Sequence, residues 1–287
     1  MEELFTERIR ILSRPLAVQP TRLSPRLQEM RGLKAVIFDI YGTLFLSGSG
    51  DIGTASAHPG VSALVEALRE QGVEMPEDLA ESAMARFYEL IALDHAREKQ
   101  RGTEIPEIRI LDIWEQWRRE AQVQIDIPQL AIDVECRLNP VWPMPGLENC
   151  LQGISALSLG LGVVSNAQVF TPCLFPALTG KSLAEFGFNP AHCVWSWTLK
   201  EAKPSLRLYQ NLLEKLKEIK PEECLFVGND MLNDVMPAQR VGMRTALFAG
   251  DRRSLRLRSG DSRVQGVEPD LVLTHLNQLM ECLVCLN

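Results

Sequence analysis

The fold is decided by the stretch Lys34-Ala-Val-Ile-Phe-Asp39-Ile-Tyr-Gly-Thr-Leu44. Its first half is a short and almost unbroken apolar run that ends on the carboxylate of Asp39. Such runs are typical of strands in parallel sheets, because helices cover both faces of these strands. The stretch therefore predicts a central parallel strand with Asp39 at its carboxyl end.

The sequence beyond residue 146 alternates between strand and helix patterns. We expect strands at Leu159–Ser165, His192–Trp197, Glu223–Gly228, Arg244–Phe248 and Asp270–Thr274, and helices at Ser205–Glu218 and Asn233–Val241. This alternation predicts an α/β fold with a doubly wound parallel sheet. Ligands of such sheets bind at the carboxyl ends of the strands. Polar residues follow three of the predicted strands, at Asp39, Ser165-Asn166 and Asn229-Asp230.

A long helical region interrupts this alternation. Residues 61–139 have helical spacing almost throughout, the stretch Ser47-Gly-Ser-Gly50 before them resembles a hinge, and prolines and Gly146 mark the return to the sheet. We therefore predict three parts: an N-terminal extension (1–32), an α/β core (33–47 and 146–287) and an all-helical cap inserted into it (48–145).

Charge and hydropathy limit the classes of partner. The 287-residue chain has a formal net charge of −7 and no run rich in Lys and Arg, which disfavours nucleic acid as a partner. No apolar stretch approaches the roughly 20 residues that span a bilayer, and the first residues lack the apolar core of a signal peptide. We expect a cytoplasmic protein that acts on a small anionic substrate; a homo-oligomer remains open.

The residues at the strand ends indicate a hydrolytic site. Asp39 is a potential nucleophile, and the turn after it is a place where backbone amides can face a substrate. An anionic substrate beside Asp39 requires a cation, which Lys203 or a divalent metal would supply. Carboxylates are the ligands that Mg²⁺ prefers, and Asp39, Asp230 and Asp234 offer them. Ser165 and Asn166 would donate hydrogen bonds to a developing anion.

Four segments, in this order, resemble the haloacid dehalogenase superfamily of hydrolases. They are Val36-Ile-Phe-Asp39-Ile-Tyr41-Gly42-Thr43-Leu, Val163-Val-Ser165-Asn166, Lys203-Pro204 and Phe226-Val-Gly-Asn229-Asp230-Met-Leu-Asn-Asp234-Val. The resemblance covers residues 33 to about 250, and the helical insert lies where members of the family carry a cap.

The resemblance implies a role for each matching residue. It makes Asp39 the nucleophile, Thr43 the residue that holds the turn, and Lys203 the residue that balances the charge of Asp39; Ser165 and Asn166 would bind the transferring group. We also expect substrate contacts from Tyr41, Gly42 and Tyr209. The implied Mg²⁺ ligands are Asp39, the backbone carbonyl of Tyr41, and the acids Asp230 and Asp234.

Two departures from the family pattern point in opposite directions. Tyr41 stands where family phosphatases carry a second Asp, which serves as general acid and base. A halide leaves without a proton, and 2-haloacid dehalogenases of the family share both the Asp-x-Tyr-Gly-Thr-Leu-Phe pattern and the spacing from Lys203 to Tyr209. Asp230 and Asp234 instead favour a metal site, although Asn229 occupies the usual place of the first acid.

The leading expectation is a Mg²⁺-dependent phosphatase that acts on a small phosphorylated metabolite. One alternative is a 2-haloacid dehalogenase, and another is a catalytically weak member that binds a ligand or a partner. The dehalogenases use an Arg that follows the first motif. Arg69, Arg86 and Arg97 are candidates for it by proximity in sequence alone, and each is expected on a solvated helix face.

Overall fold

The computed structural model describes residues 1–49 and 57–283, with only the backbone for 57–59. Gly50 of the predicted hinge lies outside the described residues. A six-stranded sheet has the order β5-β4-β1-β6-β7-β8, and all its neighbouring strands are parallel. The strands are β1 Ala35–Phe38, β4 Gly160–Ser165, β5 Phe188–Trp195, β6 Cys224–Gly228, β7 Arg244–Phe248 and β8 Leu271–Leu273. The predicted α/β fold class is confirmed.

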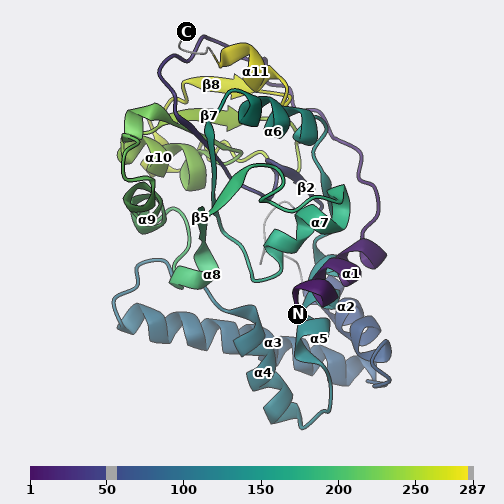
Figure 1. Ribbon diagram of the computed structural model, residues 1–287. Coiled ribbons are helices and arrows are strands. Elements are labelled where there is room, and N and C mark those ends of the chain that lie inside the picture. Colours follow the sequence, from purple (N-terminus) through teal and green to yellow (C-terminus); the bar gives the residue numbers. More distant parts are fainter. Residues whose placement is uncertain (50–56, 284–287) are drawn as a thin grey trace.

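Helices cover both faces of this sheet (Figure 1). On one face lie α6 Leu147–Ala156, α7 Leu174–Thr179 and α11 Gln278–Cys282, and on the other α9 Leu206–Leu216 and α10 Met236–Arg240. Val36 and Phe38 of β1 pack on the first face, and Ala35 and Ile37 pack on the second. Because both faces are buried, the strand reads as an unbroken apolar run. Short elements complete the core: η1 Thr171–Cys173, α8 Ser196–Leu199, η2 Pro221–Glu223 and η4 Ser262–Val264.

One predicted core helix has an unexpected form. The helix expected at Asn233–Val241 is a π-helix, η3 Met231–Val235, followed by α10. The amide of Val235 donates to the carbonyl of Asp230 five residues earlier, at 3.1 Å. Pro237 has no amide hydrogen to continue an α-helical ladder at this point. Periodicity alone does not distinguish this arrangement from an α-helix.

The helical insert is confirmed as a layer with its own hydrophobic core. It consists of α2 Ala57–Arg69, α3 Glu77–Gln100, α4 Ile110–Ala121 and α5 Ile127–Leu138. Phe87 and Trp114 stack with ring centroids 4.0 Å apart, and Trp117 lies edge-on to Trp114. In the described part of the chain, no helix has both the length and the apolarity to span a bilayer.

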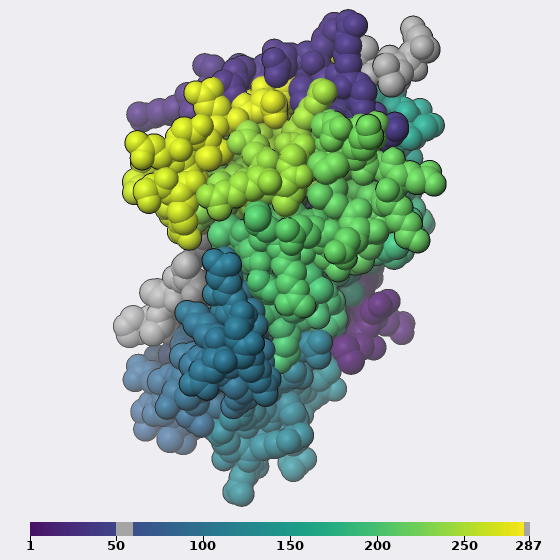
Figure 2. All heavy atoms as spheres, turned by 90° about the vertical axis from the view of Figure 1, so that its left-hand side faces the viewer, coloured from purple at the N-terminus to yellow at the C-terminus, as the bar shows by residue number. Residues whose placement is uncertain are grey.

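A small sheet that we did not predict joins the cap to the core. β2 Phe45–Ser47 pairs antiparallel with β3 Val141–Pro143, so part of the predicted cap range lies in this connection. A second junction is formed by the α3–α4 connection, where the amide of Ala202 donates to the carbonyl of Ile105 at 2.8 Å. Figure 2 shows this blue part of the cap rising against the green part of the core.

The N-terminal segment is integrated into the fold. It begins with α1 Glu2–Leu12, which packs on α5 and α7 with Phe5 and Ile9 fully buried. The proline-containing part that follows is not helical: the chain runs along the core, where Arg26 pairs with Val272. The segment therefore bridges the cap and the core.

The packing of α1 predicts a clear stability effect. Phe5 lies edge-on to Phe170, 6.0 Å between ring centroids, and is 0% exposed. Phe5→Ala should lower the free energy of unfolding by about 3–5 kcal/mol because it leaves a cavity. Urea unfolding measures this. The matched control is Ile11→Ala on the same helix, where the side chain is 48% exposed and a change within about 0.5 kcal/mol is expected. Equal effects of the two changes would contradict the account.

Candidate active site

Three adjacent strands bring the predicted residues to one edge of the sheet. β1 pairs with β4 on one side and with β6 on the other. Asp39 follows β1, Ser165 ends β4, and Asn229 follows β6. The carboxyl ends of these strands therefore form a common edge, which is where α/β sheets bind ligands.

One carboxylate oxygen of Asp39 is held by two donors. Oδ1 accepts hydrogen bonds from the hydroxyl of Ser165 and from the ammonium of Lys203, each at 2.8 Å. Asp39 is 6% exposed, and its backbone amide donates to the carbonyl of Val227. Both donors therefore stabilise negative charge on Oδ1, while no such bond is found to Oδ2 among the described residues.

Lys203 joins two carboxylates. Its ammonium also donates to Oδ1 of Asp234 at 2.6 Å, and the Lys203 side chain is only 4% exposed. Burial acts to lower the pKa of Lys203, but the charges of Asp234 and Asp39 outweigh it and raise the pKa above its usual value. Burial raises the pKa of Asp234 to about 7, and the Lys203 charge opposes this rise. Lys203 is therefore a permanent cation beside Asp39.

Asn166 fixes the position of Lys203. Its side-chain oxygen accepts a hydrogen bond from the backbone amide of Lys203 at 2.7 Å. We expected Asn166 to bind the transferring group, but in the structure its bond to Lys203 ties the second predicted motif to the third. The structure thus brings together Asp39, Ser165, Asn166, Lys203 and Asp234.

The turn after Asp39 is closely packed. Gly42 has φ +83°, and a Cβ atom there would lie 2.5 Å from Cβ of Ser254. Its amide donates to the carbonyl of Phe45 at 2.6 Å, so this amide does not face a substrate as we had expected. The hydroxyl of Thr43 donates to Asn229 at 3.1 Å, in agreement with a role in holding the turn.

The two tyrosines predicted to contact substrate are both hydrogen-bonded elsewhere. The Tyr41 hydroxyl lies 3.0 Å from the hydroxyl of Thr171, and burial raises the pKa of Tyr41 well above its usual value. Tyr209 is 0% exposed, packs against Phe226 and donates to the carbonyl of Asn233. This placement does not support the prediction that Tyr209 binds substrate; it is a core residue beneath the π-helix.

Asp230 is turned toward a different partner. Its carboxylate accepts from the amide of Leu232 at 2.8 Å, which caps the π-helix, and from the guanidinium of Arg258 at 2.6 Å. Asn229 is fixed as well, because its side-chain amide donates to the carbonyl of Ser254 at 2.6 Å. Neither Arg258 nor Ser254 was recognised in the sequence, because they belong to a loop whose spacing carries no motif.

These contacts do not fit the predicted Mg²⁺ site. Mg²⁺ takes oxygen ligands in near-octahedral geometry. Asp230 is paired with Arg258, and both oxygens of Asp234 accept hydrogen bonds, from Lys203 and from the amide of Asp230. Among the described residues no three His, Cys, Asp or Glu side chains are grouped to hold a metal. Of the predicted Mg²⁺ ligands, only Asp39 and the backbone carbonyl of Tyr41 remain as candidates.

The arginines considered for a dehalogenase lie on the surface of the cap. Arg86 pairs with Glu89 and Glu120, and its side chain is 36% exposed. Arg69 and Arg97 are more exposed still and lie near acids of their own region. Each lies on a solvated helix face, as expected.

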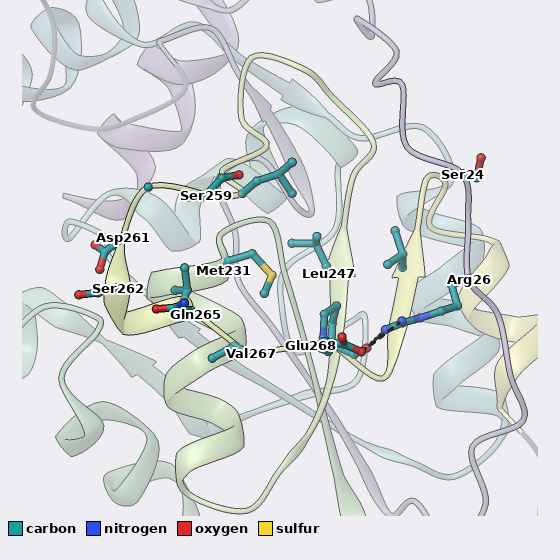
Figure 3. A pocket seen from close by; sticks show the side chains of 15 residues that line it. Ser24, Arg26, Met231, Leu247, Ser259, Asp261, Ser262, Gln265, Val267 and Glu268 are labelled. Carbon is teal, nitrogen blue, oxygen red and sulfur yellow. Dashed lines mark hydrogen bonds and ion pairs between the residues drawn. The ribbon is translucent and has the colours of Figure 1, made fainter.

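A separate cavity of about 750 Å³ opens beside β7 and β8 (Figure 3). Figure 3 shows Arg26 reaching toward Glu268 at one end and Met231 and Leu247 along the floor. This cavity is separate from the candidate active site, because its lining contains none of Asp39, Ser165, Asn166, Lys203 and Asp234.

Comparison with known proteins identifies the family. The model of the haloacid dehalogenase-like hydrolases matches residues 33–242, so the chain belongs to this family and is a hydrolase. A segment of 89 residues is 32% identical to the rhythmically expressed gene 2 protein of Drosophila melanogaster. This match spans 32% of that relative and 30% of the present chain.

Solved structures of a dehalogenase and of a phosphatase share the fold of this chain. The 2-haloacid dehalogenase of Pseudomonas syringae pv. tomato DC3000 is 22% identical, with a TM-score of 0.56 over 87% of this chain and 97% of that one. A HAD phosphatase from Thermococcus onnurineus is 20% identical, with a TM-score of 0.50 over the same shares. At these identities the likeness shows the fold alone.

The contacts of Asn229 predict the effect of placing an acid there. Asn229→Asp replaces a donor with an oxygen that faces the Ser254 carbonyl, so the free energy of unfolding should fall by about 1–3 kcal/mol. Chemical denaturation with and without Mg²⁺ measures this. Asn189→Asp is the control, since Asn189 is exposed and its side-chain oxygen only accepts from Ala191. Restoration of stability by millimolar Mg²⁺ would show that the variant binds the metal and would contradict this description.

Proposed function

We propose that the protein hydrolyses a small anionic substrate by substitution at carbon, through an ester on Asp39, as in the 2-haloacid class. The observation that carries the proposal is the pair of donors on Oδ1 of Asp39. With Oδ1 held by Ser165 and Lys203, Oδ2 is the oxygen left to attack. The attack forms a bond from Oδ2 to the substrate carbon, and the leaving group departs with the bonding electrons.

The same two donors support the second step. In the ester, Oδ1 is the carbonyl oxygen, and it becomes an oxyanion when water attacks Cγ of Asp39. A hydroxyl and an ammonium already in place at that oxygen stabilise this charge without reorganisation. We assign to Asp234, on the same ammonium, the role of accepting the proton of the water. Collapse of the oxyanion then breaks the bond between Cγ and Oδ2, Asp234 returns the proton to Oδ2, and Oδ2 leaves as the hydroxyl of the product while the oxygen of the water restores the Asp39 carboxylate.

The position of Tyr41 agrees with this choice. A phosphoester needs its alkoxide leaving group to be protonated, whereas a halide leaves as a stable anion. Tyr41 stands where the general acid would be, and burial keeps its pKa well above the usual value, so it is a poor proton donor. The leading expectation from sequence also required Asp230 as a metal ligand, and Asp230 is paired with Arg258.

A phosphoester substrate is the second candidate. The observation that favours this candidate is the second carboxylate in the site: the ammonium of Lys203 binds Asp234 as well as Asp39. It requires that Asp230 leave Arg258, or that Mg²⁺ be held with few protein ligands, as is common for this ion. Dependence on added metal therefore separates the two candidates.

The proposal predicts halide release that is independent of metal. The protein should release halide from 2-chloropropionate or 2-bromopropionate in the presence of EDTA, and Asp39→Asn should reduce the rate by at least about 10⁴-fold, since it removes the nucleophile. An ion-selective electrode measures the halide. Asp261→Asn, at an exposed ion pair with Arg263, is the control and should leave the rate unchanged.

Three results would count against the proposal. Release of phosphate from aryl phosphates, abolished by EDTA and by Asp39→Asn, would establish the second candidate. Halide release that survives Asp39→Asn would remove Asp39 as the nucleophile. Absence of turnover on both classes of substrate, together with ligand binding by calorimetry, would instead indicate a catalytically weak binding member.

A further inference from the structure

The C-terminal end of α5 is bonded to the segment that contains β2. α5 leads directly into β3, which pairs with β2, and β2 begins four residues after Tyr41. Asn139, at the end of α5, accepts hydrogen bonds from the hydroxyl of Ser47 at 2.7 Å and from the amide of Ser49 at 3.3 Å. The end of this cap helix is therefore fastened to the core next to the turn after Asp39.

Two polar atoms at this end of α5 are buried without a partner. They are Oε1 of Glu135 and Nδ2 of Asn139; neither makes a hydrogen bond of normal geometry to a described residue, although the Asn139 amide lies near enough to the Glu135 carboxyl to favour its charged form. Glu135 and Asn139 are one helical turn apart, so their side chains lie on the same side of α5. A buried polar group without a partner costs about 1–3 kcal/mol, and such groups often have a ligand as partner.

Glu135 is close to the candidate active site. Burial is the largest cause of the raised pKa of Tyr41, and the charge of Glu135 adds to it more than the charge of Asp39 does. The charges of Glu135, on the cap, and of Asp39, in the core, therefore both act on Tyr41. Cys136, next to Glu135 on α5, is the other titratable group that acts on Tyr41.

The other charged groups around α5 are paired with one another. α1 contributes Arg8, which binds Asp133 of α5 at 2.6 Å. α2 contributes Glu66 and Glu70, and both bind Arg137 of α5. α4 packs on α5 through the apolar cap core, which includes its buried Trp114 and Trp117. Among the described residues, none of these charged groups forms an ion pair with Glu135.

We propose that Glu135 in its protonated form and Asn139 are the donors that hold the leaving group of the substrate, on the cap side of the reacting carbon. This inference rests on the proposed function. In a displacement at carbon, the leaving group departs on the side opposite the nucleophile, and Asp39 attacks from the core. The O–H of Glu135 and the N–H of Asn139 then bind the departing halide, and no proton is transferred.

Burial supports this state of Glu135. It raises the pKa of the carboxyl to about 7, and the neighbouring Asn139 amide opposes the rise. The protonated, donating form therefore predominates below about pH 7 and is lost as the pH rises through that value. An ionised Glu135 would repel the departing anion, so the rate should fall over the same pH range.

Two variants of Glu135 test the inference, because one retains a hydrogen-bond donor and the other does not. Glu135→Gln keeps an N–H donor, and Glu135→Ala removes it. At pH 6, Glu135→Gln should retain kcat/KM for halide release within about threefold, and Glu135→Ala should lose about 10²-fold, as expected for removal of one donor to a developing anion. Glu135→Gln should also abolish the decline of the wild type above pH 7.

A second readout separates a donor to the leaving group from a structural role. Chloride is the poorer leaving group, so Glu135→Ala should slow 2-chloropropionate more than 2-bromopropionate. Asn139→Asp, which removes the donor but keeps the acceptor for Ser47, should show the same ordering. The exposed cap residue Glu81, changed to Gln and to Ala, is the matched control.

The outcomes distinguish the inference from the function on which it rests. A wild-type protein that releases no halide would overturn the proposed function. A wild type that releases halide, with equal losses in Glu135→Gln and Glu135→Ala or equal losses for both halides, would overturn only the role of Glu135. Retention by Glu135→Gln together with a larger loss for chloride supports the inference.

Discussion

The ammonium of Lys203, held between Asp39 and Asp234, is the interaction on which the candidate active site depends. Two buried carboxylates facing one another repel strongly unless a cation offsets their charge. Lys203 supplies that cation through its ammonium, and its backbone amide is held by the side chain of Asn166. The arrangement also fixes which oxygen of Asp39 is engaged, and it therefore determines which oxygen can attack.

The core of the fold was predictable because its strands are buried on both faces. The apolar runs at β1, β4 and β6 follow directly from that burial. The β2–β3 sheet was missed because strands of three residues, one with a proline, leave no periodic pattern. The packing of α1 on the cap and the core was not predictable either, because Phe5 and Ile9 pack against residues that are distant in sequence.

The site was predictable only where local spacing carries the chemistry. Asp39 and Ser165 stand at strand ends and Lys203 in the turn before α9, and the structure joins them. The direction of Asp230 was not predictable, because it depends on Arg258 in a later loop. Glu135 left a weaker signal: an acid between apolar positions of an amphipathic helix, whose position beside Tyr41 appears only when the cap folds onto the core.

The central claim is that Asp39 attacks carbon and is regenerated by attack of water on its own Cγ. It is tested most directly by a single turnover of 2-chloropropionate with excess protein in water enriched in heavy oxygen, followed by mass spectrometry of the peptide that contains Asp39. The account predicts one heavy oxygen in the Asp39 carboxylate and none in the hydroxyl of the product. Heavy oxygen in that hydroxyl, with an unlabelled Asp39, would contradict it.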